Sequence, residues 1–295
     1  MRFYTVEQAG RCLPALSADG GKTAFLFADL GIEAEDLAGF IRRRGADGLP
    51  DAAEALRKAD PGKAFPVQAA RLCAPIMHPD QDVICLGINY DEHAVEAGRF
   101  SQEDFGGERP YTIYFSKRVS RATAPNEPVP SYQGLVDSLD YECELGVVLA
   151  RDCKGVTKEQ AKDYIFGYTI INDISARNLQ TRHKQWYLGK SLDGFTPMGP
   201  CIVTADEIGD EQSLDISCTV NGELRQSSNT QYMIQTVCGA ISELSQGMTL
   251  QAGTIIATGT PAGVGMGMQP PQFLQPGDEV ECCIEKIGAL SNHIA

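Results

Sequence analysis

A run of acidic residues at alternate positions is the first place where this sequence could do chemistry. Asp140, Glu142 and Glu144 stand in the segment DYECELGVVLA, and residues i, i+2 and i+4 of a β-strand share one face. Like charges on one face repel, which a strand tolerates only in water or with a cation between the charges. The apolar residues that follow directly are typical of a buried strand. The pattern by itself leaves a solvated acidic edge and a metal site equally open.

A further carboxylate, Asp173, follows an apolar strand expected over residues 164–171 and precedes the segment ISAR. Taken alone, Asp173 is more typical of a helix N-cap, and so is Ser175. Paired with Glu142 and Glu144, it would complete an all-oxygen set of ligands. Three hard anionic ligands without His or Cys suit Mg²⁺, Mn²⁺ or Ca²⁺.

His93 is the leading candidate for a general base among the four histidines of the chain. His78 precedes a proline, and His293 lies near the terminus. His93 and Glu96 are three residues apart, so they meet on one turn if this stretch is helical. Glu96 would then orient the imidazole and stabilise its protonated form. A surface helix with an incidental His/Glu pair is the alternative.

Three side chains downstream of Asp173 could contact an anionic substrate. Arg177 and Gln180 share a face if their segment is helical. Lys190 lies in GKSLDG, which resembles a phosphate loop only superficially because the upstream glycines are missing. A lysine near a metal stabilises an enolate or an oxyanion. Taken singly, Arg177 and Lys190 are each more typical of a solvated surface.

The segment TGTPAGVG, residues 258–265, contains small residues directly after an apolar strand. Such a segment lets the backbone approach a ligand and offer N–H groups to a carboxylate, and the alternative is a plain turn. The strand–GxGxxG–helix context of a dinucleotide site is missing, so we do not expect NAD to bind.

Composition narrows the class of protein. The 295 residues are 43% hydrophobic and carry a formal net charge of −14, which argues against nucleic acid and anionic membranes as partners. We see no signal peptide and no membrane-spanning run, so we expect a cytoplasmic protein. Ten cysteines without a C-x-x-C motif are expected to be reduced and mostly buried.

The elements that must position these residues are mostly strands. We expect a small N-terminal domain, residues 1–70, with strands over 3–6 and 23–28, helices over 35–44 and 50–59, and a linker at 60–63. Residues 71–295 should form one strand-dominated domain, with strands over 83–88, 139–150, 164–171, 213–220, 223–227, 254–258 and 279–287. Asn221-Gly222 is a strong hairpin signal. Helices are predicted over 157–162, behind a capping box, and along the face of Ile234, Val237, Ile241 and Leu244. The fold class is therefore α+β and β-rich.

Several ordered motifs together resemble the fumarylacetoacetate hydrolase superfamily over about residues 70–295. They are GINYDEHAVE, DYECELGVVLA, NDISARNLQ, GKSLDGFTPMGP, VNGELRQ and ATGTPAGVG. The resemblance implies the mixed β-roll of that family with a small N-terminal domain, and a homodimer. It also implies that Glu142, Glu144 and Asp173 bind Mg²⁺ or a similar ion.

The same resemblance implies roles for the other candidates. His93 and Glu96 would supply the base from a lid to which residues 100–111 contribute, and Lys190 would stabilise charge at the keto oxygen. The implied substrate contacts are Arg177, Gln180, Lys190 and Thr260.

A small 2-oxo acid would chelate the metal, and the cation would stabilise the enolate formed during the reaction. We expect hydrolytic carbon–carbon cleavage of an acylpyruvate-type substrate. The alternatives are an oxaloacetate-type decarboxylase, a 2-hydroxymuconate-type isomerase or sugar-acid lyase in the same site, or a catalytically silent metal- or ligand-binding protein.

Overall fold

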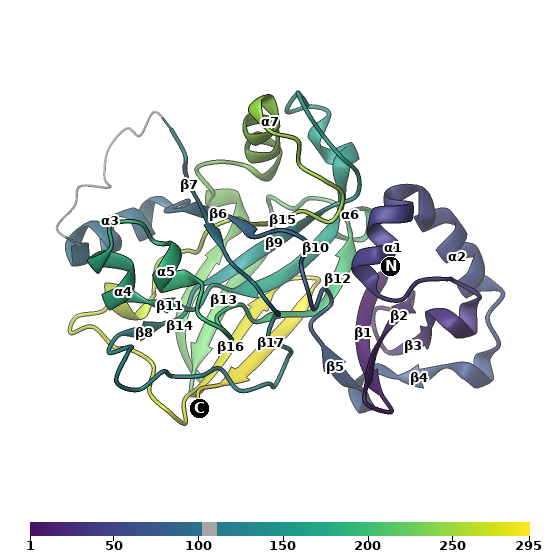
Figure 1. Cartoon of the computed structure of the whole chain (residues 1–295), viewed down its shortest axis with the longest axis horizontal. Helices are drawn as coiled ribbons and strands as arrows, with labels where there is room; N and C mark the ends of the chain where they lie inside the picture. Colours follow the sequence, from purple (N-terminus) through teal and green to yellow (C-terminus); the bar gives the residue numbers. More distant parts are fainter. Residues whose placement is uncertain (102–110) are drawn as a thin grey trace.

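The computed structural model describes residues 1–101 and 111–295, and its main feature is one large mixed sheet (Figure 1). Eleven strands of the described chain form this sheet. They are β1 (Arg2–Gln8), β2 (Arg11–Ser17), β3 (Thr23–Leu26), β4 (Phe65–Pro66), β5 (Arg71–Cys73), β6 (Val83–Gly87), β7 (Ile113–Lys117), β9 (Cys143–Leu149), β10 (Ile165–Asn172), β12 (Met198–Thr204) and β15 (Ile255–Ala257).

A second sheet of four strands packs against the middle of the first. Its order is β14-β13-β16-β17, and its strands are β13 (Asp215–Val220), β14 (Glu223–Asn229), β16 (Glu279–Ile284) and β17 (Gly288–His293). The predicted Asn221-Gly222 hairpin is present, with both residues at positive φ. Cys143 and Leu145 of β9 share one apolar core with Ile216 and Cys282 of this sheet. A two-stranded ladder of β8 (Leu139–Asp140) and β11 (Ser175–Ala176) completes the strands of the described residues.

Helices are short and lie around the sheets. The α-helices are α1 (Leu37–Arg44), α2 (Leu49–Arg57), α3 (Asp91–Ser101), α4 (Arg177–Arg182), α5 (Tyr187–Lys190), α6 (Ala205–Ile208) and α7 (Val237–Gly247). The 3-10 helices are Phe27–Leu30, Gly45–Gly48, Pro61–Lys63, Val67–Ala69, Ala161–Tyr164, Thr230–Tyr232 and Gly265–Gly267. The prediction of an α+β, β-rich chain is confirmed. None of the helices described here is long and apolar enough to cross a bilayer.

The strand order explains why distant segments meet at one place. β9 lies between β10 and β15 and is antiparallel to both, whereas β15 is parallel to β6. The start of β9 therefore lies beside the ends of β10 and β15, and the end of β6 is next to the end of β15. The segments that follow β6, β10 and β15 carry three of the motifs singled out in the sequence. Every residue of β9 and β10 is buried, as their continuous apolar runs predict.

The first 70 residues join the main sheet directly. β1 pairs with β2, with β5 and with β12, so the sheet runs on without a break from this region into the rest of the chain. Phe3, Phe27 and Phe40 form an aromatic cluster that also contacts Phe166 of β10. In Figure 1 these purple elements lie together at one side of the molecule. A domain boundary at residue 70 stays a prediction.

Three local expectations differ from the structure. The strand expected over 139–150 is interrupted between β8 and β9. Ile234 is half exposed and lies before α7 rather than in it. The helix begins only after Thr236, whose side chain caps it by accepting a hydrogen bond from the Gly239 N–H. The segment 157–162 forms a turn and a 3-10 helix rather than an α-helix, although the Thr157 N–H does donate to Gln160 Oε1 as a capping box requires.

The cysteines depart from expectation at one pair. Cys12 of β2 and Cys73 of β5 form a disulfide across 61 residues of sequence, so the prediction that all ten are reduced is wrong for these two. Both strands pair with β1, and it is this shared neighbour that brings the two residues together. The other eight are free, and all of them except Cys283 are buried.

Candidate metal centre

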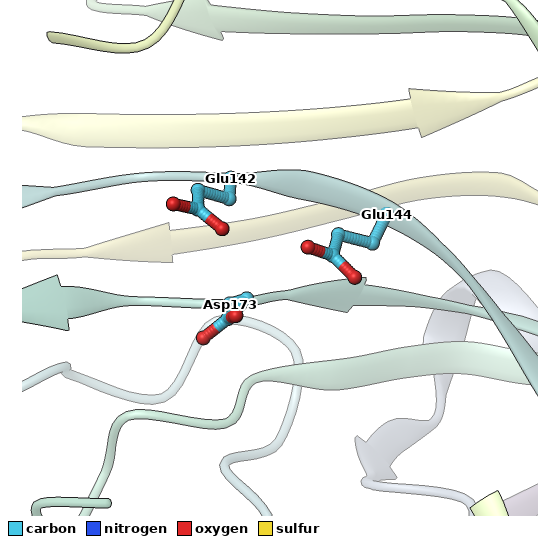
Figure 2. A group of neighbouring side chains, drawn as sticks. All are labelled: Glu142, Glu144 and Asp173. Carbon is cyan, nitrogen blue, oxygen red and sulfur yellow. The ribbon is translucent and has the colours of Figure 1, made fainter. Parts of the chain in front are cut away.

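Glu142, Glu144 and Asp173 converge at the start of β9 (Figure 2). One carboxylate oxygen of each lies within 4.8 Å of the others, and all three side chains are buried. Cys143 pairs with Asn172 across β9 and β10. The side chains of Glu142 and Glu144 therefore lie on the same face of the sheet as that of Asp173. The Asp173 N–H donates to the Glu142 carbonyl at 2.8 Å, and the Glu142 N–H donates to Asn172 Oδ1 at 3.1 Å. The two strands are thus locked in register where the carboxylates meet.

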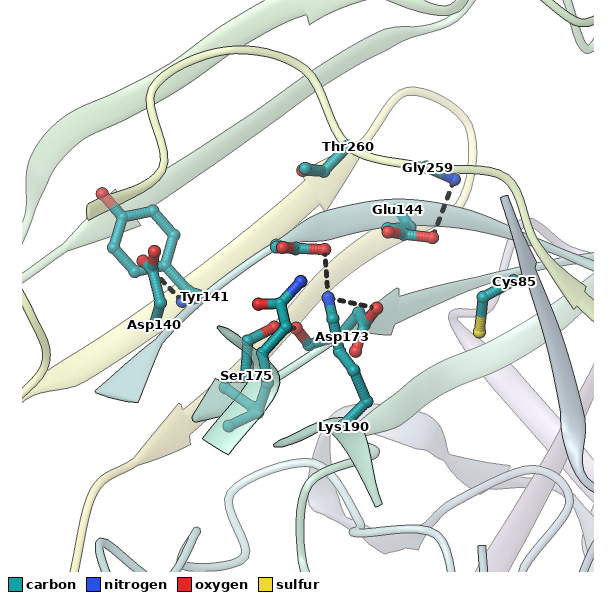
Figure 3. A network of polar contacts seen from close by, with 12 residues as sticks. Cys85, Asp140, Tyr141, Glu144, Asp173, Ser175, Lys190, Gly259 and Thr260 are labelled. Atoms are coloured by element: carbon teal, nitrogen blue, oxygen red, sulfur yellow. Dashed lines mark hydrogen bonds and ion pairs between the residues drawn. The ribbon is translucent and has the colours of Figure 1, made fainter. Parts of the chain in front are cut away.

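Asp140 does not join this group, in contrast to the expectation that three carboxylates would share one face. Its carboxylate accepts hydrogen bonds from the N–H groups of Tyr141, Gly265 and Met266 at 3.0, 2.7 and 3.0 Å. These bonds turn the chain at residue 140, which is why β8 and β9 are separate strands. Arg177 Nε adds a further bond to Asp140 Oδ2 at 2.9 Å. In Figure 3 Asp140 lies apart from Glu144 and Asp173.

Buried cations face the carboxylates. Lys190 Nζ lies 2.8 Å from Glu142 Oε2 and 2.8 Å from Asp173 Oδ2. Figure 3 shows Lys190 beside Asp173. Arg177 Nη1 lies 2.6 Å from Glu142 Oε1 and donates to Gln180 Oε1 at 3.0 Å. Arg177 Nη2 is buried and has no hydrogen-bond partner among the described residues. Asp173 is not a helix N-cap, because α4 begins after Ala176 and has no side-chain cap.

Lys117 is a site residue that sequence reasoning missed. It ends β7, is fully buried, and contacts Asp173 Oδ1 and the Ile174 carbonyl. The only signal in the sequence is a lysine that continues the short strand IYFSK. A lysine at a strand end is usually solvated, so local pattern gives no reason to place this one at the carboxylates.

Burial and charge act in opposite directions on these groups. Burial raises the pKa of Glu142, but the nearby Lys190 and Arg177 outweigh it and leave the pKa below its ordinary value. Glu144 forms no ion pair with a cation of the described residues, and burial and the charges of Asp173 and Glu142 hold its pKa well above the usual range. Burial lowers the pKa of Lys190, yet the two carboxylates raise it overall. The side-chain cations therefore stabilise a negative charge at Glu142 but not at Glu144.

His93 and Glu96 lie on one turn of α3, as their spacing predicts. Nδ1 of His93 is 3.6 Å from Glu96 Oε2, and no described residue is within hydrogen-bond distance of this buried nitrogen. The Gly263 N–H donates to both oxygens of Glu96 at 3.0 Å. Ahead of the helix, Asn89 Nδ2 donates to the Thr258 carbonyl at 2.8 Å. These bonds fasten α3 to the segment after β15. Of residues 100–111, which are expected to contribute to a lid, residues 102–110 lie outside the described residues.

Most of the candidates line one cavity of about 170 Å³; Asp173 and Glu96 do not line it but lie beside Lys190 and His93, which do. Glu142, Glu144, Arg177 and Lys190 line it, and so do His93, Gln180 and Thr260. The apolar part of the wall includes Phe115, Trp186 and Met266. Phe115 packs edge-on against Trp186 with ring centroids 5.2 Å apart, and Lys190 Nζ lies 5.3 Å from the Phe115 ring. With the exception of Asp140, the structure thus brings together the residues that the sequence singled out for a metal, a base or a substrate contact; their roles stay predictions.

The donor set suits a hard divalent cation. Three carboxylates in a buried cluster offer oxygen ligands only, which Mg²⁺, Mn²⁺ and Ca²⁺ prefer. The raised pKa of Glu144 marks the place where positive charge is lacking, and a divalent ion would supply it. The buried acidic cluster could therefore hold such an ion.

Comparison with known proteins identifies the family of this chain. The model of the fumarylacetoacetate (FAA) hydrolase C-terminal family matches residues 82–295. The oxaloacetate tautomerase YisK of Bacillus subtilis (strain 168) is 46% identical over 230 residues, which is 78% of this chain and 75% of that protein.

Solved structures cover the whole chain. A fumarylacetoacetate hydrolase from psychrophilic Exiguobacterium antarcticum superposes with a TM-score of 0.84 at 37% identity, over 100% of this chain and 99% of that one. The maleylpyruvate hydrolase from Sphingobium sp. SYK-6, crystallised with manganese(II) and pyruvate, superposes with a TM-score of 0.78 at 28% identity, over the same shares. Together with the buried acidic cluster, these matches show that the chain belongs to the fumarylacetoacetate hydrolase family.

Proposed function

We propose that this chain is a divalent-metal-dependent enzyme that interconverts the enol and keto forms of oxaloacetate or a closely similar 2-oxo dicarboxylate. The observation that carries the proposal is that His93, the base candidate, lines the same small cavity as Glu142, Glu144 and Lys190. Conversion of the enol to the keto form removes the proton from the enol oxygen and adds one to the neighbouring carbon of the enolate C=C bond, so the net change is the transfer of one proton from oxygen to carbon. The reaction needs a base and positive charge beside the enolate, which Lys190 and a divalent ion held by the carboxylates would supply.

With a divalent ion bound, the charge of the site would suit an anionic substrate. Four buried carboxylates face three buried cations, and the carboxylates are in excess by one; the seven residues are Asp140, Glu142, Glu144, Asp173, Lys117, Arg177 and Lys190. A bound divalent ion, held by Glu142, Glu144 and Asp173, would reverse the sign of the excess and act as a Lewis acid toward the enolate. A site of net positive charge then attracts a carboxylate despite the acidic surface.

The side chains have separable roles in this proposal. Arg177 Nη2 has no hydrogen-bond partner among the described residues, so it is available to a substrate carboxylate. Lys190 adds positive charge beside the enolate oxygen. His93 moves the proton, and Glu96, anchored by the Gly263 N–H, holds the imidazole in place. Phe115, Trp186 and Met266 exclude water from the apolar side of the cavity and limit the size of the substrate.

The relatives support this choice of reaction. The 46% identical relative is an oxaloacetate tautomerase. A second candidate, hydrolytic carbon–carbon cleavage of an acylpyruvate, is favoured by the likeness to the maleylpyruvate hydrolase. In that reaction the His93–Glu96 pair would activate a water molecule instead of moving a substrate proton.

One substrate panel separates the candidates. Freshly dissolved enol-oxaloacetate is followed by its ultraviolet absorbance with Mn²⁺ or with chelator, and acylpyruvates are tested beside it with identification of the products. We expect rapid metal-dependent loss of the enol without release of carbon dioxide. Pyruvate plus a carboxylic acid would support the hydrolase, and pyruvate plus carbon dioxide would indicate a decarboxylase. Mn²⁺ binding without turnover of any substrate would contradict an enzymatic role.

The role of His93 has its own test. His93→Gln should lower the rate of tautomerisation by about 100- to 10,000-fold, the range typical of general acid–base catalysis. The affinity for Mn²⁺, measured by calorimetry, should stay within about twofold of that of the original protein, because His93 does not belong to the cluster of candidate metal ligands. A variant with unchanged turnover would show that another group moves the proton.

A further inference from the structure

Gln226 lies in β14, within the VNGELRQ motif that the reaction itself leaves unused. Its side chain is fully buried and makes three hydrogen bonds. Oε1 accepts from the Cys143 N–H at 3.0 Å, and Nε2 donates to Thr260 Oγ1 at 2.7 Å and to the Pro261 carbonyl at 2.8 Å. One amide therefore links the backbone between Glu142 and Glu144 to the segment that carries Thr260.

The chemistry of these partners fixes the orientation of the amide. The Cys143 N–H can only donate and the Pro261 carbonyl can only accept, so the two ends of the Gln226 amide cannot be exchanged. The amide N–H also donates to Thr260 Oγ1, so the proton of that hydroxyl must go elsewhere, and the Cys143 carbonyl accepts it at 2.9 Å. The Thr260 hydroxyl is therefore held in one orientation, and the groups that this segment can offer a substrate carboxylate are its backbone N–H groups.

The segment after β15 also touches β14 through the backbone. A Cβ added at Gly263 would lie 1.9 Å from the Arg225 carbonyl oxygen, and the φ of Gly263 is +102°. No side chain fits between this segment and β14 at this point. The contact at Gly263 is a second, independent observation that β14 supports the segment from residue 260 to residue 263.

The metal ligands do not depend on this support to the same degree. β9 is held between β10 and β15 by main-chain ladders, and the Glu142 and Asp173 backbones bond to each other directly. Thr260 lies beyond the last residue of β15 and is outside any ladder. Loss of the Gln226 amide should therefore displace Thr260 more than it displaces the carboxylates.

We propose that Gln226 is a positioning residue that sets the place of Thr260 relative to the metal ligands, and thereby the affinity of the site for the anionic group of its substrate. The inference rests on the proposed function only where turnover is measured. Binding of oxalate, a planar dianion that imitates the enolate of a 2-oxo acid, measures the same property without turnover.

The test compares Gln226→Met with a matched control, Gln212→Met. Gln212 makes the same kind of amide bridge, since its Nε2 donates to the Thr230 carbonyl and its Oε1 accepts from the Val237 N–H, both at 2.9 Å, but it does not line the cavity. Calorimetry would measure the affinity for Mn²⁺, and then for oxalate with Mn²⁺ present. Both variants should have a lower melting temperature than the original protein, because each loses an amide that bridges two segments.

We expect Gln226→Met to bind oxalate about tenfold more weakly, the equivalent of one hydrogen bond, with Mn²⁺ affinity within about twofold of the original protein. KM for the active substrate should rise more than kcat falls. Gln212→Met should show neither change.

Gln226→Glu serves as a second, isosteric variant should the methionine variant not fold. It keeps the acceptor for Cys143 but opposes a carboxylate oxygen to the Pro261 carbonyl, so it should weaken oxalate binding as well. Unchanged oxalate affinity in a folded Gln226 variant, or an equal loss in Gln212→Met, would overturn the proposal. Failure of every substrate to turn over, with oxalate binding still sensitive to Gln226, would contradict the proposed reaction alone.

Discussion

Replacing Lys190 by methionine tests the charge balance of the site most directly. The side chain of Lys190 is 2% exposed, and its Nζ lies 2.8 Å from both Glu142 and Asp173. Removing one partner of a buried ion pair typically costs about 3–5 kcal/mol. Here Glu142 keeps Arg177 and Asp173 keeps Lys117. We therefore expect a loss at the lower end, about 3 kcal/mol in the free energy of unfolding.

A divalent ion should reduce that loss. Mn²⁺ at one hundred times its dissociation constant would stabilise the original protein by about 2.7 kcal/mol. The Lys190→Met variant should gain more from the same metal, because its carboxylates have lost a competing cation. The difference in stability between the two proteins should thus shrink when Mn²⁺ is added. Turnover should be lost in the variant with or without this rescue.

Urea denaturation followed by circular dichroism, with chelator and with Mn²⁺, provides the measurement. Lys58→Met is a suitable control, because Lys58 pairs with Glu54 at the surface and is 72% exposed; its unfolding free energy should stay within about 0.5 kcal/mol of the original. Equal stability of Lys190→Met and the original protein in chelator would refute the reasoning. So would a difference that grows when Mn²⁺ is added.

Two further predictions concern single carboxylates. Glu144→Gln should leave the metal-free protein at least as stable, because burial and the charges of Asp173 and Glu142 raise the pKa of Glu144; its Mn²⁺ affinity, measured by calorimetry, should fall more than about 100-fold, and retained affinity would exclude Glu144 as a ligand. For Asp19, partial burial raises the pKa, but hydrogen bonds from Thr23 outweigh it and lower the pKa from 3.8 to about 2. The extra stability of the original protein over Asp19→Asn should therefore be present at about pH 5 and disappear as the pH falls to about 2; a difference in melting temperature that is independent of pH would contradict this.

Local sequence determined the features that depend on the period of one element. Alternate positions in a strand placed Glu142 and Glu144 on one face, and a spacing of three placed His93 beside Glu96 on one helical turn. The Asn221-Gly222 hairpin followed from the positive φ that its turn requires. Continuous apolar runs identified β9 and β10 as buried strands.

Tertiary structure decided which of these local features meet. Asp173 reaches Glu142 only because Cys143 pairs with Asn172, a choice of register that no local pattern encodes. Asp140 shares the period of the other two acids, yet the N–H groups of Gly265 and Met266, 125 and 126 residues away, draw it out of the cluster.

The same reason applies to the residues that sequence reasoning missed. Lys117 and Gln226 are buried polar side chains whose partners come from other strands, and the Cys12–Cys73 disulfide joins two strands that are neighbours only through β1. Periodicity reports which face of an element is buried. It carries no information about the polar groups that another segment brings to that face, because these depend on sheet order and register.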